Sequence, residues 1–168
     1  AVDGGTSDEA YDFRAEAGDR WIRDWDGIVL SWSYTEPTEG EFVWTNFDNF
    51  LNEATKRGIR ILPILGGGCN YAQPSVPPNL PTWLANATRS QIVYKGTKIV
   101  YLFPILEWRN FVRACVTRYK GRITHWEIFN EPASYLTPAE YVSYLQAAYE
   151  EIKAADPAGF AGSQKTNF

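Results

Sequence analysis

One carboxylate stands where a largely apolar stretch of the chain stops. Residues 123–129 form that stretch, and Asn130, Glu131 and Pro132 follow it directly. The stretch predicts a buried strand, so we expect Glu131 at the mouth of the fold, half removed from water. Such burial raises the pKa of a carboxyl group toward the range of a working general acid. Glu131 is therefore the first candidate for chemistry.

Strand alternation places a second carboxylate below this one. On an extended strand His125, Glu127, Phe129 and Glu131 share one face. Glu127 would then point inward, one layer below the site, where a buried carboxylate needs a cation that Arg23 could supply. A lone histidine is more often a satisfied core residue than a catalyst, so His125 receives no catalytic role.

The stretches that must position these side chains alternate between strand-like and helix-like patterns, which predicts a parallel α/β architecture. The expected strands occupy residues 21–25, 59–65 and 123–129, and the end of the chain could begin one more. In a parallel sheet the carboxyl ends of the strands lie on one side. We therefore expect residues 23–25, residue 66 onward and residues 130–131 to lie close together.

Apolar residues at helical spacing predict the helices between these strands. The first has Thr45 as its N-cap, Gly58 as its stop and an apolar face of Phe47, Phe50, Leu51 and Ala54. The second has a core-facing stripe of Trp108, Phe111, Val112, Cys115, Val116 and Tyr119, and stops at Gly121. The third opens with a capping box over residues 137–140 and buries Tyr141, Leu145, Ala148, Tyr149 and Ile152.

A long proline-rich connection separates two of these elements. It runs from Cys69 to about Pro104, and residues 94–103 within it could form a small strand or hairpin. Loops of this length often carry binding sites.

Composition limits the possible functions. The 168 residues are 45% hydrophobic, enough for one packed core, and the net charge of −4 offers no basic face to nucleic acid. No apolar stretch approaches the roughly 20 residues that cross a bilayer. Cys69 and Cys115, with a single histidine, are too few for a zinc site, so we expect no metal and no cofactor. Buried or free thiols are favoured over a disulfide.

The sequence resembles a known clan of enzymes at two separate places. Residues 126–132 (Trp-Glu-Ile-Phe-Asn-Glu-Pro) look like the fourth-strand signature of glycoside hydrolase clan A, the retaining glycosidases built on the TIM barrel. The second place resembles the clan's pattern after its second strand. It comprises residues 32–37 (Trp-Ser-Tyr-Thr-Glu-Pro) and, after them, Gly40, Phe42, Trp44 and Asp48.

This resemblance implies roles for the residues at the strand ends. Glu131 would protonate the departing glycosidic oxygen and then deprotonate the attacking water, and Asn130 would bond the sugar hydroxyl beside the reacting carbon. Arg23 matches a strand-end arginine that orients a catalytic carboxylate in the clan, and this role competes with pairing to Glu127. Trp83 matches the clan's tryptophan after the third strand.

Aromatic rings commonly line carbohydrate clefts because sugars present flat faces of C–H bonds to them. Tyr71 and Trp83 are therefore candidate sugar platforms. Trp32 and Trp25 are further candidates, although core packing is at least as common a role for any one tryptophan.

The resemblance covers only part of a barrel. A complete (β/α)8 barrel takes about 250 residues, whereas this chain has strands resembling the second to fifth. The nucleophile of the clan lies on the seventh strand. We therefore expect residues 1–168 to be a single domain, the N-terminal and central part of a TIM-barrel catalytic domain from a longer, secreted enzyme.

The expected activity is retaining hydrolysis of β-glycosidic bonds in oligo- or polysaccharides. The chain would need the remainder of the barrel as its partner and a carbohydrate as its substrate. The alternative is a non-catalytic carbohydrate-binding or assembly protein that keeps the aromatic cleft and lacks the nucleophile.

Overall fold

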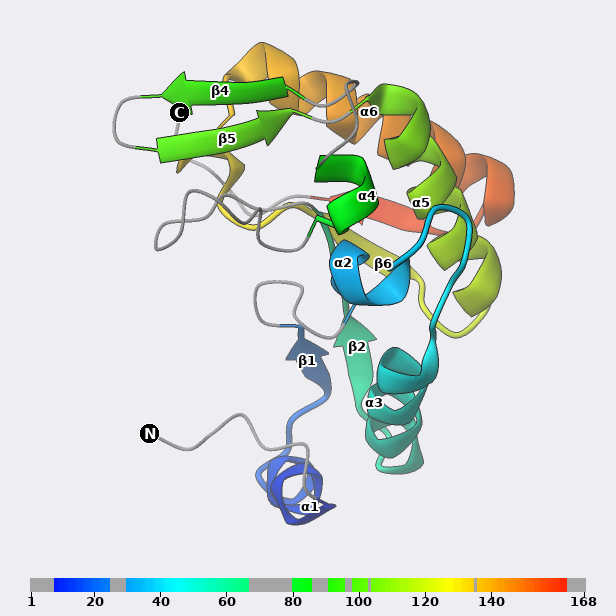
Figure 1. Ribbon diagram of the computed structural model, residues 1–168. Coiled ribbons are helices and arrows are strands. Elements are labelled where there is room, and N and C mark those ends of the chain that lie inside the picture. The colour runs from blue at the N-terminus through cyan, green and yellow to red at the C-terminus, as the bar shows by residue number, and fades with distance from the viewer. Residues whose placement is uncertain are drawn as a thin grey trace.

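The computed structural model describes residues 8–24, 30–66, 80–85, 91–95, 98–102, 104–134 and 136–162, whose arrangement is shown in Figure 1. Short strands alternate with helices along these ranges, as the sequence predicts. The strands are β1 (Trp21–Arg23), β2 (Arg60–Leu62), β3 (Ile64–Leu65), β4 (Gln91–Lys95), β5 (Lys98–Leu102), β6 (His125–Ile128) and β7 (Phe160–Gly162).

Parallel pairing joins the main strands in the order in which they occur along the chain. β1 pairs with β2, β3 with β6, and β6 with β7, and every one of these pairs is parallel. Because each crossover advances in the same direction, the connecting helices lie on one face of the sheet. This order is typical of an α/β barrel rather than of a doubly wound sheet.

The segment expected as one strand over residues 59–65 is divided at Pro63 into β2 and β3. The backbone oxygen of Leu62 accepts a hydrogen bond from Asp24 N–H at 2.9 Å, whereas that of Pro63 accepts one from Glu127 N–H at 3.0 Å. Proline has no N–H, so the ladder cannot run through it unbroken. The expectation of a single strand is wrong here, because hydrogen bonding passes from β1 to β6 at Pro63.

The described α-helices are α1 (Asp8–Glu16), α2 (Trp32–Thr35), α3 (Thr45–Lys56), α4 (Thr82–Ala85), α5 (Ile105–Tyr119) and α6 (Pro138–Ala155). The three predicted helices are present as α3, α5 and α6, whereas α1, α2 and α4 were not predicted. Gly58 and Gly121, just beyond α3 and α5, have φ angles of 70° and 76°, which glycine adopts without strain. No helix in the described ranges is long and apolar enough to cross a bilayer.

The predicted helix starts differ in accuracy. The capping box of α6 is confirmed: Thr137 Oγ1 accepts a bond from Glu140 N–H at 3.3 Å, and Glu140 Oε2 accepts one from Thr137 N–H at 2.8 Å. The prediction of Thr45 as the N-cap of α3 is wrong, because Trp44 occupies the N-cap position and Thr45 is the first helical residue.

The buried face of α6 is rotated from the expected one. Tyr144 and Ala147 are buried, whereas Tyr149 is 51% exposed. The prediction for Tyr149 is therefore wrong, and those for Tyr141, Ala148 and Ile152 are confirmed.

Aromatic side chains fill the core between the sheet and the helices. Trp32 stacks on Phe111 with ring centroids 4.7 Å apart, and Trp108 stacks on Phe129 at 5.2 Å. Cys115 is a free and fully buried thiol, as expected, and burial raises its pKa well above the ordinary value. Cys69 lies outside the described residues.

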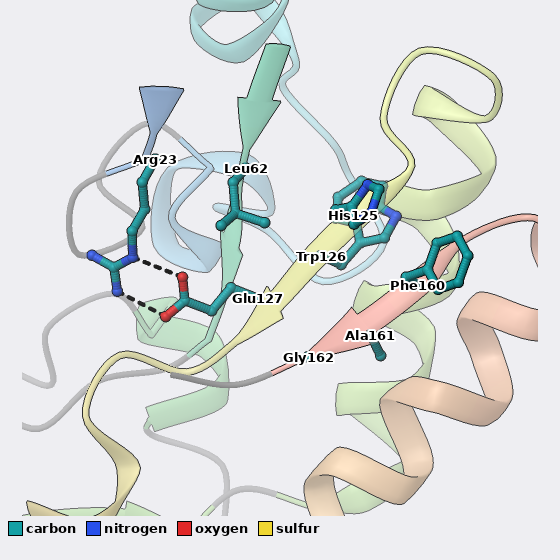
Figure 2. Close-up of a pocket in the computed structure, with 8 residues that line it drawn as sticks. All are labelled: Arg23, Leu62, His125, Trp126, Glu127, Phe160, Ala161 and Gly162. Carbon is teal, nitrogen blue, oxygen red and sulfur yellow. Dashed lines mark hydrogen bonds and ion pairs between the residues drawn. The ribbon is translucent and has the colours of Figure 1, made fainter. Parts of the chain in front are cut away.

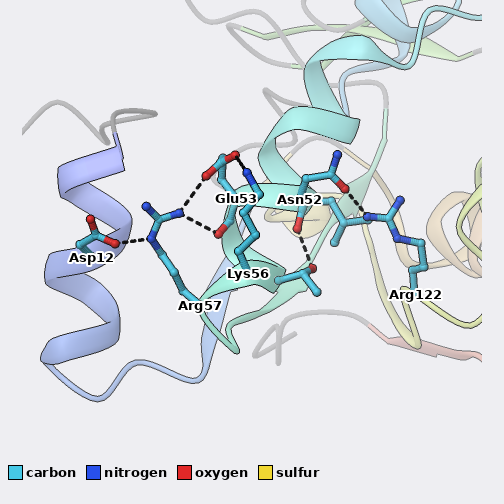
Figure 3. A network of polar contacts seen from close by, with 8 residues as sticks. Asp12, Asn52, Glu53, Lys56, Arg57 and Arg122 are labelled. Carbon is cyan, nitrogen blue, oxygen red and sulfur yellow. Dashed lines mark hydrogen bonds and ion pairs between the residues drawn. The ribbon is translucent and has the colours of Figure 1, made fainter.

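Polar contacts join the outer elements to α3, as Figure 3 shows. Arg57, at the end of α3, bonds Asp12 of α1 and donates to Glu53 Oε2 at 2.8 Å. Arg122, in the turn before β6, donates to Asn52 Oδ1 at 2.6 Å. These contacts tie α1 and the turn after α5 to the same helix.

The small strand or hairpin expected within residues 94–103 is a hairpin, and its first strand begins earlier than expected, at Gln91. β4 and β5 pair antiparallel, with Val93 opposite Val100. In Figure 1 the arrows of β1 and β2 point toward the end of the molecule that carries this hairpin and α4. The described parts of the long connection, α4 and the hairpin, therefore lie at the end of the molecule toward which β1 and β2 run.

Candidate active site

The chain leaves β6 through a sharp backbone turn. Phe129 N–H still donates to the backbone oxygen of Leu65 at 2.8 Å, so sheet pairing continues to this residue. Phe129 and Glu131 then have φ angles of 62° and 46°, in the left-handed region that side chains disfavour. A 3₁₀ turn over Pro132–Ser134 follows. Asn130 is thus held between two strained residues, a pattern that often marks a functional site.

Phe129 anchors this turn in the core. Its ring is 1% exposed, stacks on Trp108 and meets the ring of Tyr144 edge-on at 5.6 Å. Gly66, just after β3, leaves room for the ring, since a Cβ added there would lie 2.7 Å from Phe129 Cδ1. The expectation that Phe129 shares a face with His125 and Glu127 is wrong, because the positive φ turns its side chain to the helix side.

Arg23, Glu127 and Asn130 form one hydrogen-bonded group across β1 and β6. Arg23 Nε donates to Glu127 Oε2 at 2.7 Å and Arg23 Nη2 donates to Glu127 Oε1 at 2.8 Å, the two bonds drawn in Figure 2. Arg23 Nη2 also donates to Asn130 Oδ1 at 2.7 Å. Glu127 is 4% exposed, so its charge is buried against the guanidinium. The predicted pairing of Glu127 with Arg23 is confirmed, and Arg23 and Asn130 meet as the expected clustering of strand ends requires. Trp25 and residues 67–79, which belong to the same prediction, lie outside the described residues.

The Glu131 side chain is exposed to solvent. The expectation that it is half removed from water is therefore wrong for this structure. The reason is the turn after β6: the positive φ of Glu131 lifts it away from the sheet, whereas an extended strand would have continued the alternation.

The upstream motif forms a buried cluster around Glu36. This carboxylate is 5% exposed and accepts bonds from Trp32 Nε1–H at 2.7 Å and from Gly40 N–H at 2.9 Å. Burial raises the pKa of Glu36, and these two hydrogen bonds oppose the rise. The Trp32 ring is completely buried, so it offers no face to a sugar in this structure and is a core residue.

The remaining candidate sugar platforms differ in what the structure describes. Trp83, in α4, is half-buried, and its Nε1–H donates to the backbone oxygen of Glu36 at 2.9 Å. Tyr71 and Trp25 lie outside the described residues. Sequence reasoning missed Glu36 as the link between the two regions, although its position next to Pro37 inside the motif was a usable signal.

A pocket of about 370 Å³ lies on the sheet face opposite the helices. Figure 2 shows its lining residues, which are Arg23, Leu62, His125, Trp126, Glu127, Phe160, Ala161 and Gly162. His125 is exposed between the rings of Trp21, at 5.3 Å, and Phe160, at 5.1 Å, so the expectation of a core histidine is wrong. Within the described residues, no group of three or more His, Cys, Asp or Glu side chains could hold a metal ion.

The arrangement suits proton transfer beside an oriented amide. An exposed carboxylate on Glu131 follows directly after Asn130, whose amide oxygen is fixed by Arg23. Glu127 is committed to its ion pair, so it is a structural group rather than a second reacting carboxylate.

Both motifs lie within the range that matches one known protein family. The profile of glycosyl hydrolase family 10 matches residues 29–158. Among curated proteins, endo-1,4-beta-xylanase A of Phanerodontia chrysosporium is 30% identical over 138 residues, which are 76% of this chain and 29% of that protein. Endo-beta-1,4-xylanase Xyn10C of Cellvibrio japonicus is 27% identical over 146 residues, 79% of this chain and 22% of that one. The chain thus spans less than a third of the length of each of these two relatives.

Solved structures show the same likeness in the fold. A family 39 glycoside hydrolase from Bacteroides cellulosilyticus WH2 superposes with a TM-score of 0.64 at 23% identity, covering 93% of this chain and 28% of that one. Xylanase 10C of Cellvibrio japonicus, a mutant in complex with xylopentaose, superposes with a TM-score of 0.62 at 20% identity, covering 93% and 30%.

Proposed function

Because this chain belongs to glycosyl hydrolase family 10, within clan A, we propose that it takes part in retaining hydrolysis of β-1,4-linked xylan. The observation that carries the proposal is the Asn130–Glu131 pair at the carboxyl end of β6, inside the matched range 29–158. The named relatives are endo-1,4-beta-xylanases, which supports xylan as the substrate class.

In the proposed mechanism Glu131 donates a proton to the glycosidic oxygen as the bond to the anomeric carbon breaks. The same carboxylate then takes a proton from the water that attacks the glycosyl-enzyme intermediate. The solvent-exposed position of Glu131 suits this second step, which needs access to water. The Asn130 amide bonds the hydroxyl beside the anomeric carbon, an interaction that strengthens as positive charge develops.

The second carboxylate of a retaining site lies about 5 to 5.5 Å from the first and attacks the anomeric carbon. We place it on a strand outside this chain, whose strands run in the order of roughly half a barrel. On this proposal residues 1–168 are one part of a larger, extracellular catalytic domain, and the remainder of the barrel completes the site. Trp83 and Tyr71 are the proposed sugar platforms.

Replacing Glu131 by alanine in the natural protein tests the proposal. Turnover of xylooligosaccharides should fall by about 10²–10⁴-fold, whereas an aryl xyloside with an acidic leaving group should lose less activity in glycosyl transfer to the enzyme, because that group departs without protonation. Pre-steady-state kinetics separates this step from the later attack by water. Glu41→Ala, a change at an exposed glutamate outside the site, serves as the matched control.

Equal losses on both substrates in the first step would contradict the acid role of Glu131. Binding of xylan without any hydrolysis by the natural protein would favour a non-catalytic carbohydrate-binding protein instead.

A further inference from the structure

Backbone geometry alone does not fix the direction of the Asn130 side chain. On a regular strand, alternation determines where each side chain points. Asn130 follows Phe129 and precedes Glu131, and both neighbours have positive φ. The alternation therefore ends before Asn130, and a side-chain contact has to orient its amide.

Arg23 supplies that contact, and its own position is fixed by Glu127. The Nε and Nη2 atoms of the planar guanidinium both bond the buried carboxylate, which determines the plane of the group. The bond from Nη2 to Asn130 Oδ1, at 2.7 Å, then has a fixed direction as well. Because the amide oxygen faces Arg23, the amide NH2 group of Asn130 is directed away from the guanidinium.

We propose that Arg23 is a positioning residue: held by Glu127, it orients Asn130 so that the amide NH2 presents to the glycan hydroxyl beside the reacting carbon. This inference rests on the proposed glycosidase function. It assigns Arg23 a role in catalysis that acts through the Asn130 amide.

The variant Arg23→Lys separates the effect of the positive charge from the effect of the guanidinium geometry. An ammonium group keeps a cation beside Glu127, so the buried carboxylate stays paired. It lacks the planar fork that bonds both Glu127 oxygens and the Asn130 oxygen in fixed directions. Arg23→Lys is therefore expected to loosen the Asn130 amide while preserving the charge pair.

The test compares Arg23→Lys, Asn130→Ala and the double variant in the natural protein. The substrates are an aryl β-xyloside and its analogue without the hydroxyl beside the anomeric carbon. The readout is the ratio of kcat/KM for the two, which cancels their intrinsic reactivity when variants are compared. Each single variant should lower this ratio by about tenfold or more, mainly through kcat on the full substrate, because the lost bond strengthens in the transition state.

The double variant should have the same ratio as Asn130→Ala, since Arg23 acts only through that amide. Arg20→Lys, at an exposed arginine just before β1, should leave the ratio unchanged. Thermal unfolding of each variant reports whether it is folded. If Arg23→Lys does not fold, Glu127→Gln replaces it, because it keeps Arg23 and weakens one of the bonds that fix the guanidinium.

Several outcomes would overturn the inference. If Arg23→Lys lowers kcat/KM equally on both substrates, Arg23 acts through the fold alone. If the double variant lowers the ratio further than Asn130→Ala, Arg23 affects the hydroxyl by another route. An Asn130→Ala variant with the wild-type ratio removes the contact on which the inference depends. Absence of any turnover by the wild-type protein would instead refute the proposed function itself.

Discussion

The contact between Gly66 and Phe129 connects core packing to the candidate site. A Cβ at position 66 would lie 2.7 Å from Phe129 Cδ1 and 3.4 Å from Phe129 Cα, so the ring or the backbone would have to move. We predict that Gly66→Ala lowers the free energy of unfolding by about 1–3 kcal/mol, as overpacking does. Activity should fall as well, because Asn130 follows Phe129 directly.

Urea unfolding and kcat/KM on a xylooligosaccharide measure the two effects. Gly162→Ala is the matched control, since a Cβ there would meet no atom within 4 Å. Equal stability and equal activity of the two variants would contradict the anchoring role of Phe129.

At the level of single residues the sequence predicts the pairing of Arg23 with Glu127, because alternation identifies a carboxylate that burial must neutralise. It does not predict the exposure of the Glu131 side chain or the turn of the Phe129 side chain toward the helices. Both depend on positive φ angles, which hydrophobic patterns do not encode and which non-glycine residues rarely adopt. The bond from Trp83 to the Glu36 backbone was also hidden, since it joins residues 47 positions apart.

Among the elements, α6 begins with a cap whose contribution can be isolated. Thr137 and Glu140 satisfy each other's backbone N–H groups at the start of this helix. We predict that Thr137→Ala lowers the free energy of unfolding by about 1 kcal/mol, because Glu140 N–H loses its partner. Chemical denaturation measures the change.

Ser143→Ala is the control within the same helix. Its hydroxyl donates to the Ala139 oxygen at 3.0 Å on an exposed face and caps no free N–H group. The change should stay within about 0.5 kcal/mol. A cap variant as stable as this control would show that the start of α6 is held by other contacts.

Element positions follow largely from sequence periodicity, and the errors have physical causes. The stops at Gly58 and Gly121 were predictable because glycine tolerates the left-handed turn that ends a helix. Pro63 divides a strand whose apolar pattern is continuous, since the pattern reflects burial and not hydrogen bonding. The buried face of α6 was misplaced at Tyr149 because tyrosine is compatible with both a core and a surface position.

At the scale of the whole molecule, exposed apolar side chains of the described residues include two groups beside β7. Trp21 and Phe160, on the sheet face opposite the helices, are 41% and 57% exposed. On α6, Val142 and Tyr149 are 56% and 51% exposed, and with Leu145 and Ala161 they line a second cavity between α6 and β7. Large exposed apolar patches commonly mark surfaces that bind other protein segments.

We predict that the 168-residue chain made alone self-associates through these surfaces. Val142→Lys combined with Tyr149→Lys should reduce the associated fraction, measured by sedimentation velocity, by placing charge on the α6 surface. Val43→Lys, at an equally exposed position near α2, should change it little. A wild-type chain that remains monomeric at high concentration would contradict the prediction.

The parallel order of strands was predictable because strand and helix patterns alternate, and parallel crossovers obey a fixed handedness. The two motifs together pointed to the right clan, and the match over residues 29–158 assigns the chain to family 10 within it. On the proposed function the shape of the substrate cleft also depends on strands outside this chain, so no pattern in this sequence could predict it.

The hydrogen-bonded group of Arg23, Glu127 and Asn130 can form only late in the synthesis of the chain. Arg23 and Glu127 are 104 positions apart, so a nascent chain carries Arg23 out of the ribosome well before its partner is synthesised. At about 5–20 residues per second the delay is roughly 5 to 20 seconds. Until then the guanidinium lacks the Glu127 carboxylate, and closing so long a loop is entropically costly. The oriented Asn130 amide therefore forms late, and its appearance would report that translation has passed β6.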